Sequence, residues 1–249
     1  MDKARTLMEI TSPEAGRILA ETRLAIIPLG SVEQHGGHLP LGTDYYAAEA
    51  FARRVTALTG GLLADFCPYG VTPLHMGFPG TVTLRAETLI ALLLDVVGSL
   101  HRHGARRFVY LNWHERNAPA AEIAAERAQN EHEGARVLIV NAHFVAKNLY
   151  GQKVGLTHGG ELEVLPLLAD RPGLVHLERA TDPSPMDHGA QSDRLRRDPA
   201  IYFVPRDVRE MYATGWYGLI EDTSPGRVAQ VMEGVSRAAA ERFRAFFGM

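Results

Sequence analysis

Four short, mostly apolar segments recur along this 249-residue chain, and they restrict its fold more than any other feature. They occupy residues 24–29, 62–66, 107–111 and 135–140. Segments of this length suit buried strands, and stretches with apolar residues at helical spacing separate them. Strands that alternate with helices form a parallel sheet, and strands that are apolar on both faces need helices on both sides. The sequence therefore predicts an α/β fold in three layers, with helices covering both faces of a mainly parallel central sheet.

Helices are expected between and after these strands. Ser12-Pro13-Glu14 combines a capping residue, a proline at the first helical position and an early acid, so a helix should run to about Thr22. The last helix should carry an apolar stripe from Val228 to Phe246. At 249 residues the chain falls within the range of one α/β domain, so we expect residues 1–249 to form a single domain.

Possible metal ligands concentrate where the first apolar segment ends. The stretch from Ile27 to Asp44 places Glu33, His35, His38 and Asp44 within twelve positions. In an extended segment Glu33 and His35 project to the same side, and nearby glycines allow turns that return the other two residues to it. A lone Glu-x-His pair usually lies in a solvated loop. This denser set of nitrogen and oxygen ligands instead predicts a site for zinc, manganese or iron(II).

Three later segments carry residues that could join this site. The third apolar segment also ends in polar residues, so His114 should reach the same sheet edge as Glu33 if the two strands are neighbours. A loop rich in glycine and proline holds His75. Two glycines at the start of a further helix bare backbone N–H groups that favour anions, and His158 and Glu163 lie there about one turn apart.

The charge pattern and the single cysteine limit the classes of partner and location. The formal net charge is -3 and the basic residues are scattered, so neither nucleic acid nor an anionic membrane is expected as a partner. Cys67 has no second cysteine with which to form an intramolecular disulfide. The N-terminus lacks an apolar signal core, and no apolar run approaches the roughly 18 residues of a membrane span. We expect a soluble, cytoplasmic protein.

Residues 169–202 are dense in proline, aspartate and arginine and show no periodicity. A run of this length without regular structure is usually functional or a contact between subunits, so we expect a homo-oligomer. His176 and His188 fall within it; we assign neither a role and favour exposed loop histidines as the interpretation.

Five motifs, in this order along the chain, give it a resemblance to a known family. They are PLGSVEQHGGHLPLGTD at residues 28–44, FPGT at 78–81, NxHxxN at 112–117, HGGExE at 158–163 and GWYG at 215–218. The chain resembles the creatininase family, also called creatinine amidohydrolases. The resemblance implies a creatininase-like α/β fold, a hexamer, and hydrolysis of C–N bonds in cyclic or linear amides with one or two divalent metal ions.

The resemblance also implies roles for individual residues. By motif position, the implied metal ligands are Glu33, His35, Asp44 and His114. Asp44 would bridge the ions where two are bound. His158 and Glu163 would lie beside the substrate.

Two departures separate this chain from the members that hydrolyse creatinine. Those members carry a glutamate ligand of the second metal where this chain has Arg116. Glu115 is one position away and is an imperfect substitute ligand, because adjacent residues of an extended segment point in opposite directions. Those members also enclose creatinine with tryptophans, whereas residues 144–156 offer only Phe144 and Tyr150. Creatinine itself is therefore not the expected substrate.

The predicted activity is metal-assisted hydrolysis of a small, non-peptide amide by zinc, manganese or iron. We expect Glu163 to carry the proton to the leaving nitrogen, and His158 to stabilise the oxyanion or to share that transfer. Arg116 is expected to bind an acidic group of the substrate, because its planar fork suits carboxylates and phosphates. His75 and Trp113 are the remaining expected substrate contacts.

Two other functions remain open at this point. A metal-dependent lactone-opening enzyme or isomerase could use the same scaffold, and it would release no amine. A descendant without activity could bind a metabolite, although an idle site has no physical need for so many buried polar ligands.

Overall fold

The computed structural model describes residues 4–153, 157–181, 198 and 200–249, and within them a parallel sheet forms the centre. Its strands are β1 (Leu24–Leu29), β2 (Leu62–Leu63), β3 (Arg107–Asn112) and β4 (Arg136–Asn141). They lie in the order β2-β1-β3-β4, and every neighbouring pair is parallel. All of β1 is buried, which explains why its sequence is apolar throughout instead of alternating.

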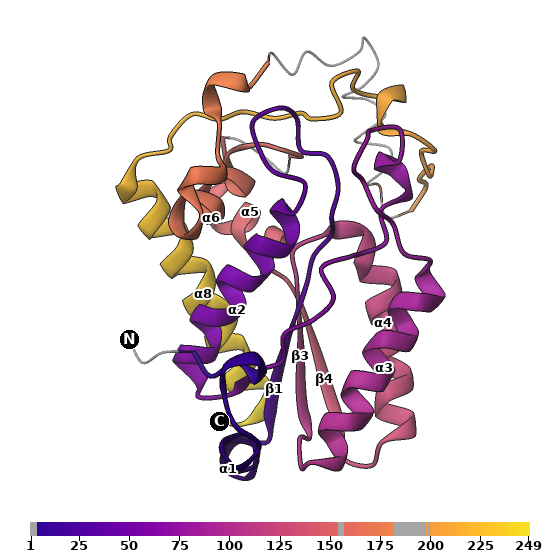
Figure 1. The fold of residues 1–249 in the computed structure, drawn as a ribbon, viewed down its shortest axis with the longest axis vertical. Coiled ribbons are helices and arrows are strands. Elements are labelled where there is room, and N and C mark those ends of the chain that lie inside the picture. The colour runs from indigo at the N-terminus through magenta and orange to yellow at the C-terminus, as the bar shows by residue number, and fades with distance from the viewer. Residues whose placement is uncertain (1–3, 154–156, 182–197, 199) are drawn as a thin grey trace.

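Helices form a layer on each face of this sheet, as Figure 1 shows. One layer contains α2 (Thr43–Thr59), α5 (Ala142–Tyr150), α6 (Glu161–Asp170) and α8 (Pro225–Phe247). The other face is covered by α1 (Ser12–Thr22), α3 (Ala86–Arg102) and α4 (Ala118–Glu131). Short 3-10 helices lie at Leu7–Glu9, Pro73–His75, Glu115–Asn117, Pro172–Leu174, Leu177–Arg179 and Val208–Glu210. The predicted three-layer α/β fold is confirmed.

Alternate residues of β1 supply the two cores. Leu24 and Ile26 pack into the cluster under α2 and α8, while Ala25 and Ile27 pack into the cluster under α3 and α4. Each fully buried leucine or isoleucine contributes about 1.5–3 kcal/mol to stability. The strand that leads into the predicted metal site is therefore held from both sides.

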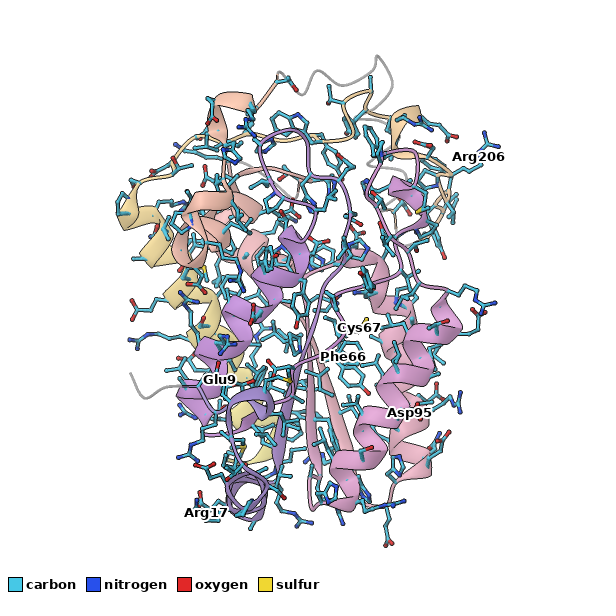
Figure 2. The ribbon with its side chains drawn as sticks, in the orientation of Figure 1. Glu9, Arg17, Phe66, Cys67, Asp95 and Arg206 are labelled. Carbon is cyan, nitrogen blue, oxygen red and sulfur yellow. The ribbon has the colours of Figure 1, made fainter. Side chains whose placement is uncertain are left out.

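The strand β2 ends earlier than the sequence predicts, well before Phe66. The backbone N–H of Ala64 still donates to the carbonyl of Ile26 at 2.8 Å. The next donor of this parallel ladder would be residue 28 of β1. Pro28 has no N–H, so the ladder stops there. Phe66 instead packs into the α3–α4 cluster, and Figure 2 shows it beside the free Cys67.

The sequence does not predict α5. The segment has only nine residues, no side-chain cap at Asn141 and no acidic residue in its first turn, so the usual start signals are missing. Ala142 and Ala146 pack into the α2–α8 cluster, and these tertiary contacts stabilise the short helix. The residue His143, which follows β4, is therefore helical and buried.

The sheet register places three strand ends side by side. Leu29 lies opposite Asn112, and Asn112 lies opposite Asn141. The segments that follow β1, β3 and β4 therefore leave from one edge, towards the top of Figure 1. This is the carboxyl edge at which open α/β sheets bind ligands.

Much of the aperiodic segment lies outside the described residues, including residues 182–197 and His188. The expected subunit contact within residues 169–202 therefore stays a prediction, as does the single domain. No helix in the described ranges combines the length and the apolar character that crossing a membrane requires.

Candidate metal centre

Glu33, His35 and Asp44 converge at the carboxyl end of β1, and each is at most 2% exposed. The loop after β1 carries the first two, and Asp44 lies in the first turn of α2, where the helix dipole favours an anion. Gly30 makes this approach possible. A Cβ atom at Gly30 would lie 2.3 Å from the Cα of Tyr45, so a larger residue would push α2 away.

His114 joins this group from the end of β3, as predicted. Its Nδ1 lies 2.8 Å from Oδ2 of Asp44 and 3.5 Å from Oε2 of Glu33. Nε2 of His35 approaches the other oxygen of the same aspartate, with 3.3 Å to Oδ1. The Ser31 hydroxyl donates to Oδ2 of Asp44 at 2.7 Å. The two oxygens of Asp44 thus face different histidines.

Three sets of side chains in the described part of the chain have ligand atoms that all lie within 4.8 Å of one another. The sets are Glu33–Asp44–His114, His35–Asp44–Glu163 and Glu33–His35–His158. The four ligands implied by the resemblance all belong to these sets, and so do the two residues expected beside the substrate.

Two residues considered as ligands from the sequence are absent from these sets. Glu115 lines the adjacent cavity together with His114, but it lies in the 3-10 helix Glu115–Asn117 and not in the extended segment assumed for it. Nε2 of His38 donates to the Gly159 carbonyl at 2.7 Å, and its ring packs edge-on against Trp216. His38 therefore links two loops of the site.

Backbone carbonyls orient the histidine rings of the three sets. Nε2 of His114 donates to the Val71 carbonyl at 3.1 Å, so Nδ1 is the nitrogen that faces the carboxylates and that a cation would bind after displacing its proton. Nδ1 of His35 donates to the carbonyl of Glu33 at 3.0 Å and leaves Nε2 towards Asp44. A histidine that binds a metal usually has its second nitrogen held in this way. The donor set and its orientation therefore fit a zinc, manganese or iron(II) ion.

The electrostatics of the cluster also favour a cation. Burial opposes the charged form of His35, but Asp44, Glu163 and Glu33 outweigh it and raise the pKa to about 10. For His114, burial is likewise outweighed by Glu33 and Asp44, and the pKa rises to about 9. The pKa of Asp44 is held well below its usual value, because His35 and His114 overcome the effect of burial. The carboxylates thus create a strongly negative field inside the protein.

Glu163 approaches the cluster from the first turn of α6. Its Oε2 lies 3.8 Å from Nε2 of His35 and accepts a hydrogen bond from the backbone N–H of Gly159. Burial raises the pKa of Glu163 to about 8; His35 opposes this shift, and the negative charge of Asp44 adds to it. A carboxyl group with this pKa can exchange a proton near neutral pH.

His158 lies beside the Glu33 carboxylate and the rings of His35 and His75. Its Nε2 donates to the Gln34 carbonyl at 2.6 Å, so Nδ1 faces Oε1 of Glu33 at 3.6 Å. Its ring stacks on His75 with 4.3 Å between centroids. Burial, together with the nearby His75 and His35, holds the pKa of His158 well below its usual value. His158 is therefore a neutral base that presents an unprotonated nitrogen to the site.

The residues expected to contact substrate line a cavity beside the cluster. Arg116 and His75 both contribute to its wall, and Nε2 of His75 lies 3.6 Å from Oε1 of Glu33. Trp113 also reaches the wall, but it is only 2% exposed and stacks on Phe51 with 5.0 Å between centroids. Trp113 thus belongs largely to the core.

Four further polar residues of the site are not identified from the sequence. The Thr72 hydroxyl donates to Oε2 of Glu33. The Gln34 amide donates to the Gly215 carbonyl at 2.7 Å and to Nδ1 of His75 at 2.8 Å. Ser31 orients Asp44, and His143 lines the cavity. One signal could have identified His143: it follows β4 much as His114 follows β3.

The chain is similar to known proteins over most of its length. The model of the creatininase family, described as creatinine amidohydrolase, matches residues 8–243. A creatinine amidohydrolase of Pseudomonas putida is 30% identical over 205 residues, which cover 74% of this chain and 79% of the relative. A solved structure of creatininase with Mn has 26% sequence identity and a TM-score of 0.81, and covers 98% of this chain and 99% of its own.

Two other similar proteins carry different functional names. A mycofactocin precursor peptide peptidase of Mycobacterium ulcerans (strain Agy99) is 36% identical over 163 residues, 62% of this chain and 61% of the relative. A 3-dehydro-scyllo-inosose hydrolase of Thermotoga maritima is 29% identical over 175 residues, 67% of this chain and 56% of the relative. The named substrates of these relatives thus include a peptide and an inosose as well as creatinine.

Proposed function

This chain belongs to the creatininase family, and we propose that it is a metal-dependent amidohydrolase that cleaves a C–N bond of a small cyclic or linear amide. The relatives named above are hydrolases, which supports hydrolysis as the class of reaction. The cleavage of a C–N bond and the small amide as substrate are proposed for this chain.

One observation carries the proposal. Glu33, Asp44 and His114 place two carboxylates and an imidazole nitrogen within 4.8 Å of one another in a buried site. The outer nitrogen of His114 is tied to a backbone carbonyl, so its inner nitrogen is available as a ligand. Burying these groups together is unfavourable unless a cation or protons compensate the charge.

We assign one tightly held divalent ion to Glu33, Asp44 and His114, with zinc, manganese or iron as candidates. A divalent ion held there would lower the pKa of water to about 7 and polarise the scissile carbonyl. His35 and Glu163 offer a second position that shares Asp44. Arg116 lines the same cavity, and its positive charge disfavours a second cation.

Proton transfer falls to Glu163 and His158. The raised pKa of Glu163, about 8, supports its role in carrying a proton from the attacking water to the leaving nitrogen. Nδ1 of His158 faces the site without a proton, so of the two roles expected for this residue the contacts support sharing the transfer. Gly159 fixes the Glu163 carboxylate through its backbone N–H, and both Glu163 and His158 line the cavity.

The arginine in the cavity wall supports an anionic substrate. Arg116 is partly buried and lines the same cavity as Glu33, Asp44 and His114. A guanidinium group there would bind a carboxylate or phosphate of the substrate through paired hydrogen bonds. Arg116→Ala should then raise KM for an acidic amide far more than for its neutral analogue, and an equal rise for both would exclude this role.

The named substrates of the relatives widen the range of amides to be tested. We propose a non-peptide amide, but a short peptide must be included because the mycobacterial relative is named as a peptidase. Creatinine is not the proposed substrate, because Arg116 departs from the creatinine-hydrolysing pattern. We also propose that the protein is a homo-oligomer in the cytoplasm, with a hexamer as the assembly.

The test is amine release from a panel of acidic and neutral amides, cyclic amides and short peptides, with the metal content measured on the same protein. We expect at least one amide to be hydrolysed, with activity lost on chelation and restored by manganese or zinc. Turnover of a lactone or ketose without amine release would favour the lactone-opening or isomerase alternative. A metal-loaded protein that binds panel compounds but turns none over would favour the non-catalytic alternative.

A further inference from the structure

His143 is a buried polar group that the mechanism above does not use. It lies in the first turn of α5, directly after β4, and is 5% exposed. Its ring packs edge-on against Trp113, with 6.5 Å between centroids, and lies tilted against Phe144, with 4.4 Å between centroids. It also lines the cavity that contains Glu33, Asp44 and His114. The end of β4 thus contributes a side chain to the same site as the ends of β1 and β3.

Neither ring nitrogen of His143 makes a hydrogen bond of normal geometry with the described residues, although the Asn112 backbone lies close enough to oppose part of the fall in its pKa. Trp113, whose indole nitrogen is likewise without a partner, lines the same cavity. Burying such groups lowers stability unless something satisfies them, and buried polar side chains are rarely left unpaired. When such a group lines a ligand cavity, the ligand itself can supply the missing partner.

The charge state of His143 limits what that ligand group can be. Burial lowers the pKa of His143 to about 4, and the negative charges of Glu115 and Asp44 only partly oppose this. A neutral imidazole carries one donor and one acceptor. Its acceptor nitrogen needs an N–H or O–H donor from the ligand, which an ionised carboxylate cannot supply.

We propose that His143 is a substrate-binding residue that recognises an uncharged N–H or O–H group of the substrate from the β4 side of the metal cluster. This inference rests on the proposed function, because it assumes that a cation holds the reacting group nearby. The substrate would then place an acidic group at Arg116 and an uncharged polar group at His143, two residues that line the same cavity. His143 then contributes to specificity and not to metal binding.

The first test needs no substrate. His143→Phe keeps the aromatic packing and removes both nitrogens, so the full-length protein should melt at the same or a higher temperature and bind as much metal. Tyr110→Phe is a matched control, because the Tyr110 hydroxyl is also buried without a partner but lies in the α3–α4 core. A melting temperature for His143→Phe several degrees below wild type would show a structural role and overturn the proposal.

The second test measures recognition with two chelating probes on the cobalt-substituted protein. Acetohydroxamic acid has an N–H group, and N-methylacetohydroxamic acid has a methyl group in its place. Wild type and Tyr110→Phe should bind the first at least fivefold more tightly in a visible-absorbance titration. His143→Phe should lose this preference, and His143→Gln should keep part of it.

The outcomes separate the two proposals. An equal preference in His143→Phe and wild type, or no preference in wild type, would overturn the role of His143 while leaving the metal site intact. A wild-type protein that takes up no cobalt would refute the proposed function, and this inference would fall with it.

Discussion

Replacing Asp44 by asparagine tests the assignment of the metal centre most directly. The change preserves the shape of the side chain and removes one buried negative charge. Oδ1 and Oδ2 of Asp44 lie 3.3 Å and 2.8 Å from nitrogens of His35 and His114, so an ion between them would lie close to the lost charge. The effect should therefore appear in metal affinity.

The size of the effect follows from these distances. A pair of unit charges about 3.3 Å apart in an effective dielectric near 20 interacts by about 5 kcal/mol. The amide oxygen of asparagine still offers a ligand atom, so we expect a loss of about three to four powers of ten in Kd. Ser31 donates to Asp44 at 2.7 Å without contacting the proposed ion, so Ser31→Ala should lose only about ten- to a hundredfold.

The assay is a competition titration with a chromogenic zinc chelator, together with metal analysis after dialysis. Circular dichroism and gel filtration of Asp44→Asn would establish that the variant is folded. A zinc Kd for Asp44→Asn within tenfold of wild type would refute the assignment of Asp44 as a ligand. A larger loss for Ser31→Ala than for Asp44→Asn would also contradict the reasoning.

Three further predictions address the proton carrier, the pH dependence and the assembly. Glu163→Gln should lower kcat by at least about a hundredfold while the protein keeps its one tightly held ion, because removing a proton carrier costs about two to four powers of ten; release of an ion in this variant would identify Glu163 as a ligand. Metal affinity should rise with pH from 6 to 8, because the pKa values of His35 and His114, about 10 and 9, mean that a cation must displace protons; an affinity independent of pH would contradict this charge assignment. Light scattering at micromolar concentration should give a multiple of 27.3 kDa, and a monomer would refute the proposed homo-oligomer.

The fold and the main part of the site could be predicted because they depend on residues that are close together in the sequence. The strand β1 is apolar at every position, and the candidate ligands Glu33, His35 and Asp44 follow it within one loop and one helical turn. His114 required one further assumption, that β1 and β3 are neighbours, and the register of the two strands confirms that assumption. Parallel strands that end at one edge bring their following residues together.

The parts that could not be predicted depend on contacts between distant segments. The loop after β2 brings Thr72 to Glu33, because the pairing of β2 with β1 ends near Pro28. No local sequence pattern predicts this contact. The short helix α5 has no start signal and is stabilised by packing, so the burial of His143 could not be read from its neighbours in sequence. Whether His158 acts as acceptor or donor depends on the Gln34 carbonyl.

The pairing of β1 with β3 also has a consequence for how this chain folds. Glu33, His35 and Asp44 are close in sequence, so a chain that has not yet folded can already offer a weak cation site. His114 joins them only after the ladder from Leu24–Arg107 to Leu29–Asn112 has formed, and closing so long a loop is slow. The complete ligand set is therefore a product of late tertiary assembly. A cation should consequently slow unfolding more than it accelerates folding, because it binds most tightly to the state in which the two strands are already paired.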